Sequence, residues 1–197
     1  MDTTYKYGNK NAILKWKHIY NNKLSSIIVA GIDHYNYNVS SNSNAVNSYK
    51  LGYTINQNNF KADFTYRKDN KQTFNFGVSS ILYKLHPGSF LPYGSRSLVK
   101  PNVLQPEQGL ESAAYLGYQY NITSDLSLNA GIRYSMFNYL GPHNTYNYLA
   151  GLPKETATIT DTASFSSGKI IKTYRGPEYR VSLRYALPGD ASFKTGL

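Results

Sequence analysis

Alternation of apolar and polar residues over 110–140 is the feature of this sequence that most limits its fold. Apolar residues fall at every second position over 126–135, and the same pattern runs over 115–122. A period of two residues is that of a β-strand. The turn 123–125 (Thr-Ser-Asp) joins the two stretches into a hairpin. This hairpin therefore has one apolar face and one polar, basic face.

Two environments suit such a hairpin. In a soluble β-sandwich the apolar face is the core, whereas in an outer-membrane barrel it meets lipid and the polar face lines a wet lumen. Alternation is the same in both, so the order of strands and connections has to decide between them.

Composition narrows the classes of protein. The length of 197 residues predicts one domain, and no run of eighteen apolar residues is present, so no transmembrane helix is expected. The absence of cysteine excludes disulfides and cysteine-based metal sites. The net charge of +10 is spread singly along the chain without a nucleic-acid motif, so no nucleic-acid partner is expected. The 20 tyrosines recur near the ends of apolar stripes, which fits either a membrane-interface girdle or the general preference of strands for tyrosine.

The chain reads as strands joined by connections of two kinds. We expect strands at 12–20, 24–37, 60–67, 73–82, 115–122, 126–135 and 179–187, with an incomplete one at 191–197. Short turns at 21–23, 69–71, 123–125 and 188–190 alternate with long loops near 38–58, 86–109 and 140–177. The second long loop holds Pro87, Pro92, Pro101 and Pro106, which argue against a central strand there. The predicted fold class is all-β, an antiparallel meander of about eight strands forming a section of a transmembrane outer-membrane β-barrel.

The strict alternation places all short turns at one end of the sheet. Outer-membrane barrels have this asymmetry, with short periplasmic turns and long extracellular loops. The sequence also offers neither helices nor a second set of strands to cover the apolar face. Lipid is the simplest cover for it.

Three stretches carry a resemblance to a known family. ESAAYLGYQYNIT with LSLNAGIRYS, YRVSLRYAL and ADFTYRKDNKQTFNFGV resemble barrel hairpins of TonB-dependent outer-membrane receptors, particularly those of Bacteroidetes. The resemblance implies TonB-driven uptake of a scarce nutrient (a siderophore, vitamin or glycan) across the outer membrane of a Gram-negative cell. It also implies a plug domain inside a barrel of about twenty-two strands.

Residues 1–197 lack a plug, a TonB box and, in the polar first eleven residues, a signal peptide. We therefore expect a partial barrel, whose partners are the lipid bilayer, the remaining barrel and plug, and through these the TonB complex. A self-contained eight-stranded barrel, acting as an anchor or adhesin, is the alternative. A soluble β-sandwich binding module is a further alternative and needs two packed sheets.

Candidate site residues follow from the two faces and from the loops. The basic and polar positions of the strands predict lumen-facing side chains at Lys61, Arg67, Asn129, Arg133, Arg180 and Arg184. Loop aromatic and basic residues are candidate ligand contacts, with ordinary solvated loop residues as the alternative interpretation: Tyr93, Arg96, Lys100, Tyr146 and Tyr148.

No catalytic site is expected, so the protein is not predicted to be an enzyme. Asp33 and His34 are adjacent on a strand and point to opposite faces, and the loop histidines His86 and His143 have no paired carboxylate. No metal-ligand spacing, nucleotide-binding loop or nucleophile motif occurs, so neither a metal nor a cofactor is predicted.

Overall fold

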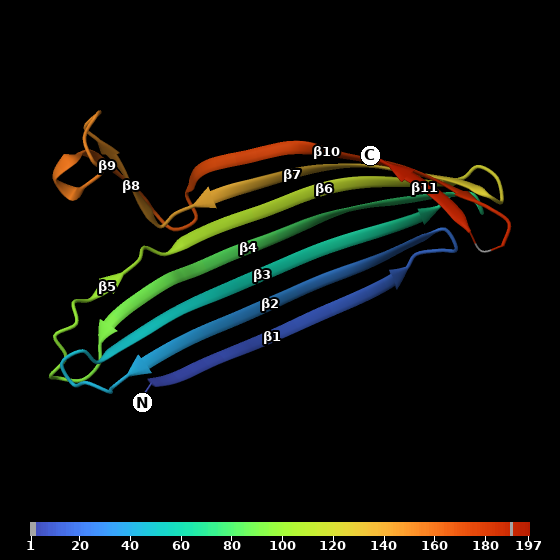
Figure 1. Ribbon diagram of the computed structural model, residues 1–197. Coiled ribbons are helices and arrows are strands. Elements are labelled where there is room, and N and C mark those ends of the chain that lie inside the picture. Colours follow the sequence, from blue (N-terminus) through green and yellow to red (C-terminus); the bar gives the residue numbers. More distant parts are fainter. Residues whose placement is uncertain (1–2, 190) are drawn as a thin grey trace.

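The computed structural model describes residues 3–189 and 191–197, and the elements in them are β-strands and one short 3-10 helix (Figure 1). The strands are β1 (Thr3–Ile19), β2 (Leu24–Ser41), β3 (Tyr49–Arg67), β4 (Gln72–Pro92), β5 (Asn102–Val103), β6 (Glu107–Asn121), β7 (Leu126–Leu140), β8 (His143–Tyr148), β9 (Ile159–Phe165), β10 (Ile170–Ala186) and β11 (Ser192–Gly196). The 3-10 helix η1 (Thr156–Thr158) precedes β9. The described residues form no helix of the length and hydropathy that crossing a membrane requires.

The main sheet is a simple antiparallel meander, which confirms the predicted fold class. Its order is β1-β2-β3-β4-β6-β7-β10-β11, and β5 adds to β4 as a ninth strand. The short strands β8 and β9 pair separately, in the connection between β7 and β10. Neighbouring strands of the main sheet are consecutive in the sequence in all but two places: β5 lies between β4 and β6, and the β8–β9 hairpin lies between β7 and β10.

The four hairpin turns lie together at one end of the sheet, as predicted, and the longer connections lie at the other (Figure 1). We call these the turn end and the loop end. Asp190, the last residue of the predicted turn 188–190, lies outside the described residues.

Three turns are closed by the same local chemistry. Asn21 Oδ1 accepts hydrogen bonds from the backbone N–H groups of Lys23 and Leu24, at 2.8 and 2.9 Å. Asp69 and Thr123 each accept from the second and third residues that follow them. Side chains that bond the backbone two or three residues onward stabilise tight turns, so sequence alone fixes these positions.

The predicted loop 38–58 is too long. β2 continues to Ser41 and β3 begins at Tyr49, so the connection is 42–48. The Asn- and Ser-rich residues on either side pair in register, for example Ser40 with Lys50. Their backbone groups find partners in the ladder although their side chains lack the apolar alternation that marks a strand.

The predicted loop 86–109 is also wrong in its bounds, because β4 runs through Pro87 to Pro92 and β6 begins at Glu107. The pairing of β4 with β6 stops at Leu85, and the register with β3 shifts near Pro87. Proline is tolerated at sheet edges and at such irregularities because no ladder hydrogen bond is lost there. The prolines therefore end the β4–β6 pairing but not the strand.

The third predicted loop, 140–177, contains the hairpin of β8 and β9 and the start of β10 at Ile170. Pro177 lies inside β10, opposite Tyr134 of β7. On its other side β10 pairs with β11 only from Ser182 onward, so Pro177 occupies an edge position. β1 likewise begins at Thr3 and not at Ala12, because its polar first half pairs with β2.

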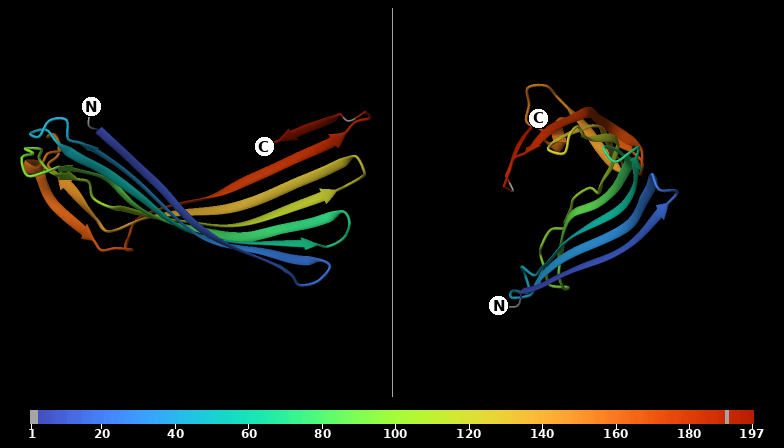
Figure 2. Two further views of the ribbon diagram at one scale, coloured as in Figure 1. Left: turned by 90° about the horizontal axis from the view of Figure 1, so that it is seen from below. Right: turned by 90° about the vertical axis from the view of Figure 1, so that its right-hand side faces the viewer.

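The sheet is strongly curved and has a concave and a convex face (Figure 2). The register places on one face the apolar residues Phe60, Phe64, Phe74, Phe76, Leu126, Leu128, Ile132, Val181 and Leu183. This is the convex face. Nothing in the described chain covers it: Phe60, Ile132 and Val181 are 46%, 45% and 47% exposed. The second packed sheet that a soluble sandwich requires is thus not formed by the described residues.

The main sheet has two free edges. Within residues 3–189 and 191–197, β1 pairs only with β2 and β11 only with β10. This agrees with the prediction that the first and last strands stay unpaired, whereas a self-contained eight-stranded barrel requires a ladder between them.

Candidate functional site

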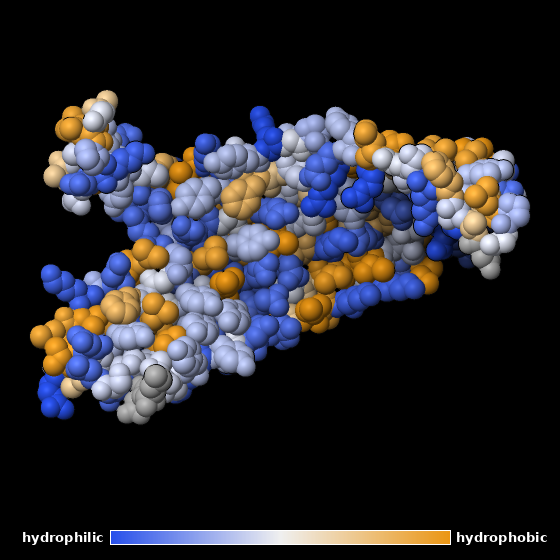
Figure 3. All heavy atoms as spheres, viewed as in Figure 1, coloured by the Kyte–Doolittle hydropathy of each residue, from blue (hydrophilic) through white to orange (hydrophobic). Residues whose placement is uncertain are grey.

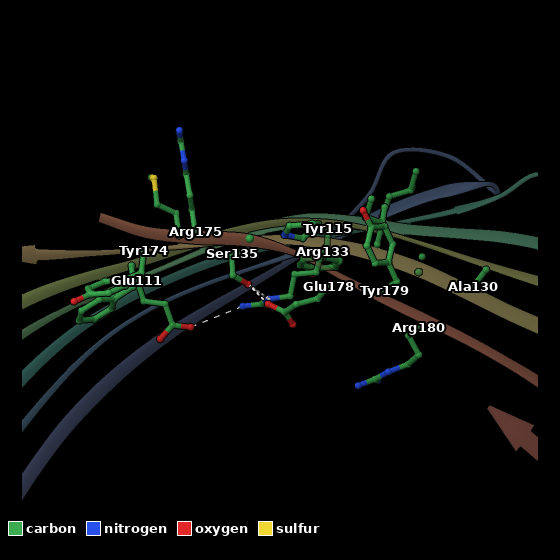
Figure 4. A pocket seen from close by; sticks show the side chains of 18 of the residues that line it. Glu111, Tyr115, Ala130, Arg133, Ser135, Tyr174, Arg175, Glu178, Tyr179 and Arg180 are labelled. Carbon is green, nitrogen blue, oxygen red and sulfur yellow. Dashed lines mark hydrogen bonds and ion pairs between the residues drawn. The ribbon is translucent and has the colours of Figure 1, made fainter. Parts of the chain in front are cut away.

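An open hollow of about 1110 Å³ lies on the concave face, over β6, β7 and β10 (Figure 4). Its floor contains Gly117 and Gly131, which are direct ladder partners. A Cβ atom at either position would reach only ordinary van der Waals contact. The missing side chains of this pair therefore leave the hollow open in the middle of the sheet.

Arg133 organises the wall of this hollow. Its Nε donates to Ser135 Oγ at 3.0 Å, and Ser135 Oγ donates in turn to Glu178 Oε1. Two ion pairs add to this, from Nη2 to Glu111 Oε1 and from Nε to Glu178 Oε1, each at 3.9 Å. Figure 4 shows these side chains on the same side of the ribbon, while Arg175 points to the opposite side.

Lys61 and Tyr115 also line the hollow. Lys61 Nζ lies 2.8 Å from Asp63 Oδ2 and 6.0 Å from the centre of the Tyr115 ring. The hydroxyl end of Tyr115 lies over Gly77, where a Cβ atom would come within 2.6 Å of it. Acidic and basic side chains therefore stand together around the hollow, and Figure 3, which looks onto this face, shows hydrophilic side chains gathered over the middle of the sheet.

The register places all six predicted lumen-facing residues on this concave face. Four of them line the hollow: Lys61, Asn129, Arg133 and Arg180. Arg67 and Arg184 lie on the same face but closer to the turn end, outside the hollow. The structure therefore brings together residues that the sequence places on separate hairpins.

The predicted ligand contacts at the loop end form two groups rather than one. Tyr93, Arg96 and Lys100 follow β4, and the Tyr93 backbone hydrogen-bonds Ser48 of the 42–48 loop. Lys50 Nζ lies 4.5 Å from the centre of the Tyr93 ring. Tyr146 and Tyr148 instead lie on β8, with ring centres 6.4 Å apart. Figure 1 shows the two groups apart from each other at the loop end.

Sequence reasoning missed a set of aromatic residues on the strands themselves. On the loop-end part of the concave face the register aligns residues that we call the aromatic shelf: Tyr35, Tyr37, Tyr53, Tyr83, Phe137 and Tyr139. The rings of Tyr37 and Tyr53 stack at 5.0 Å. Phe137 lies over Gly109 and borders both the hollow and a second recess of about 200 Å³ that Tyr83 and Tyr139 also line. Continuing the alternation past Asp33 would have revealed Tyr35 and Tyr37.

Asp33 and His34 point to opposite faces, as predicted. Asp33 Oδ2 accepts from Asn59 Nδ2 at 3.2 Å, while His34 Nδ1 lies 2.6 Å from Asn56 Oδ1. In the described part of the chain, no three His, Asp or Glu side chains are grouped so as to hold a metal ion.

Comparisons with known proteins give a fold. No protein-family model matches the chain, and no curated protein sequence matches it. The open form of the ferric-catecholate import receptor Fiu from E. coli K12 aligns with 99% of this chain and 36% of its own, at 11% identity and a TM-score of 0.58. The closed form of Fiu aligns with 93% of this chain and 31% of its own, at 14% identity and a TM-score of 0.49. The copper transporter OprC aligns with 98% of this chain and 37% of its own, at 10% identity and a TM-score of 0.45.

The chain thus spans about a third of the length of these structures. Its alignment with the open form of Fiu shows an antiparallel all-β meander with the fold of an outer-membrane barrel section.

Proposed function

We propose that this chain forms part of the barrel wall and extracellular loops of a TonB-dependent receptor. The receptor takes up a scarce nutrient across the cell outer membrane of a Gram-negative bacterium. The observation that carries the proposal is the separation of the two faces: an uncovered apolar convex face stands behind a concave face with a charged hollow. A wall between lipid and a wet lumen needs this distribution.

The fold supports the proposal through the arrangement of its connections. Short turns at one end and long connections at the other match the periplasmic and extracellular ends of outer-membrane barrels. Uptake driven by TonB, the plug domain and the Bacteroidetes type rest on the sequence resemblance alone. The chain's partners under this proposal are lipid, the rest of the barrel with its plug, and the TonB complex.

The concave face provides a route for the nutrient. The aromatic shelf lies at the loop end, where a nutrient enters, and Phe137 connects it to the charged hollow below. The aromatic rings suit planar groups or sugar rings of a nutrient, and the Arg133 guanidinium and the Lys61 ammonium suit its anionic groups. Siderophores, vitamins and glycans each have one or both kinds of group.

Uptake can be measured with three labelled probes in a Gram-negative host that expresses the complete receptor containing this chain. The probes are a ferric catecholate complex with iron-55, cobalamin with cobalt-57, and an oligosaccharide with carbon-14. We expect one probe to accumulate in cells with active TonB and not in cells without it. If none accumulates while the protein is present in the outer membrane, the proposal is wrong.

A matched pair of variants tests the role of the hollow. Gly131→Trp fills its floor, whereas Ala130→Trp places the same ring on the convex face one position away. We expect Gly131→Trp to abolish most accumulation and Ala130→Trp to leave it near the wild-type level. Equal uptake by both variants would exclude the hollow from the route.

A further inference from the structure

The smaller recess, at the loop end of β6, has aromatic walls and a floor without a side chain. Its volume is about 200 Å³, and the residues that line it include Tyr83, Leu85, Glu107, Gly109, Phe137 and Tyr139. We call it the ring recess. Pockets that hold a whole drug-sized ligand measure roughly 300 to 1,000 Å³, so this recess suits a single group of a larger molecule.

The register explains why three rings surround one glycine. Tyr83 of β4, Gly109 of β6 and Tyr139 of β7 are ladder partners in one row across the sheet. The two tyrosines share the concave face, and glycine contributes no side chain between them. Phe137 reaches over this floor, because a Cβ atom at Gly109 would come within 2.7 Å of Phe137 Cζ. The rings therefore enclose a gap that only glycine leaves open.

A carboxylate stands at the outer end of the ring recess. Glu107 is the first residue of β6 and the ladder partner of Leu85, two residues from Gly109 and on the same concave face. The pairing of β6 with β7 ends at Gln108, one residue short of Glu107. Within residues 3–189 and 191–197 the Glu107 carboxylate forms no ion pair. None of these side chains therefore neutralises its charge by direct contact.

Lys172 of β10 is the ladder partner of Tyr139 and brings the neighbouring positive charge. Its Nζ lies 4.9 Å from the centre of the Tyr174 ring, which lines the larger hollow and not the ring recess. A cation within about 6 Å of a ring centre is attracted by the negative face of the ring. The lysine ammonium is therefore held over a ring outside the recess.

We infer that the ring recess binds a cationic group of the transported molecule, a quaternary or alkyl ammonium. Three electron-rich rings beside a carboxylate are the combination with which aromatic cages recognise ammonium ligands. An anionic group would be repelled by Glu107, and a neutral group would gain little from its charge. That the bound molecule is a nutrient rests on the proposed function, whereas the affinity of the recess for ammonium groups does not.

Choline and 3,3-dimethyl-1-butanol test the inference, because they have nearly the same shape and differ in the charge of the quaternary centre. The complete receptor containing this chain is titrated with each probe in detergent micelles, and saturation-transfer NMR measures the dissociation constants. We expect choline to bind about tenfold more tightly, as one desolvated cation–π contact allows. Equal or tighter binding of the neutral alcohol would make the recess a purely apolar site and would overturn the inference.

A matched pair of carboxylate variants tests the role of Glu107. Glu107→Gln keeps the size of the side chain and removes its charge, so the affinity for choline should fall about tenfold, toward that of the neutral alcohol. Asp33→Asn is the control, since Asp33 is a carboxylate on the same concave face, on β2 and outside the recess. We expect it to leave the affinity for choline unchanged. An equal loss in both variants would mean a general attraction to a charged face and would contradict a specific site.

Two further variants change the walls and the floor. Gly109→Ala places a methyl group against the Phe137 ring and should abolish binding of both probes. Tyr139→Leu removes one ring without this close approach, so a poorly folding Gly109→Ala does not decide the result. Undiminished choline binding by Tyr139→Leu would overturn the inference. Uptake of the labelled nutrients is measured separately: choline binding without any uptake supports the inference and overturns the proposed function, and uptake without choline binding does the reverse.

Discussion

Arg133 of β7 and Glu178 of β10 lie directly opposite each other in an antiparallel ladder, and Arg133 Nε is 3.9 Å from Glu178 Oε1. Ser135, two residues along β7, hydrogen-bonds both partners. The side chains are 36% and 60% exposed, so water competes with the ion pair. The pair therefore shapes the hollow more than it stabilises the sheet.

We expect a double-mutant cycle of Arg133→Gln and Glu178→Gln to give a small coupling energy. Exposed ion pairs contribute up to about 1 kcal/mol, because solvent screens the charges and ordering two long side chains costs entropy. The measurement is denaturant unfolding, in lipid vesicles, of the complete receptor containing this chain, as the wild type, both single variants and the double variant. A coupling several times larger would mean that the hollow is closed to water.

Ala130→Arg should destabilise the protein in a bilayer by about 2 to 4 kcal/mol, because the convex face of β7 meets lipid at this depth. Asn129→Arg is the matched control, since Asn129 is the preceding residue and lies on the concave face. We expect the control to cost much less. Unfolding free energies in vesicles measure both, and equal costs would contradict the assignment of the two faces.

The turn at Asp69 should respond to acid. The backbone N–H of Lys71 donates a hydrogen bond to the Asp69 carboxylate and, with a second bond from Gln72 and the charges of Lys68 and Lys71, lowers the pKa of Asp69 from its ordinary value of 3.8. A lowered folded pKa means that the turn is stabilised above the ordinary value, and that this stabilisation is lost as the pH falls through the folded pKa.

Carboxyl-carbon NMR of the protein in micelles measures this titration directly. We expect the Asp69 midpoint below 3.8, and Lys71→Pro, which removes the donating N–H, should raise it. A midpoint for Asp69 at or above its ordinary value would show that the turn hydrogen bonds do not form.

Thr123→Ala should destabilise the β6–β7 hairpin by about 0.5 to 1.5 kcal/mol, the net value of a typical hydrogen bond. Thr123 Oγ1 accepts from the N–H groups of Asp125 and Leu126, at 3.2 and 3.0 Å, and alanine has no acceptor. Thr123→Ser keeps the oxygen and should recover most of the loss. Unfolding in vesicles measures both variants, and an unchanged stability for Thr123→Ala would show that backbone pairing alone closes this turn.

The sequence determined the turns and the two faces of the clean strands, because both depend on neighbouring residues only. Asn21, Asp69 and Thr123 close their turns with bonds to residues two and three positions away. The strict alternation in β3, β4, β7 and β10 fixes which side chains share a face, since the pleat has a period of two. The meander order and the concave position of Arg133 and Arg180 follow from these local rules.

Tertiary structure decided how far the strands continue and what surrounds each concave residue. Around Ser40 and Lys50 the Asn- and Ser-rich sequence lacks the apolar alternation that marks a strand, and only the pairing of β2 with β3 shows it. Pro87 and Pro177 are accommodated because neighbouring strands end or shift beside them, which depends on distant parts of the chain. The Arg133 network and the hollow over Gly117 and Gly131 arise from the register of three strands, and register is set by the pairing of whole hairpins and not by any single stretch of sequence.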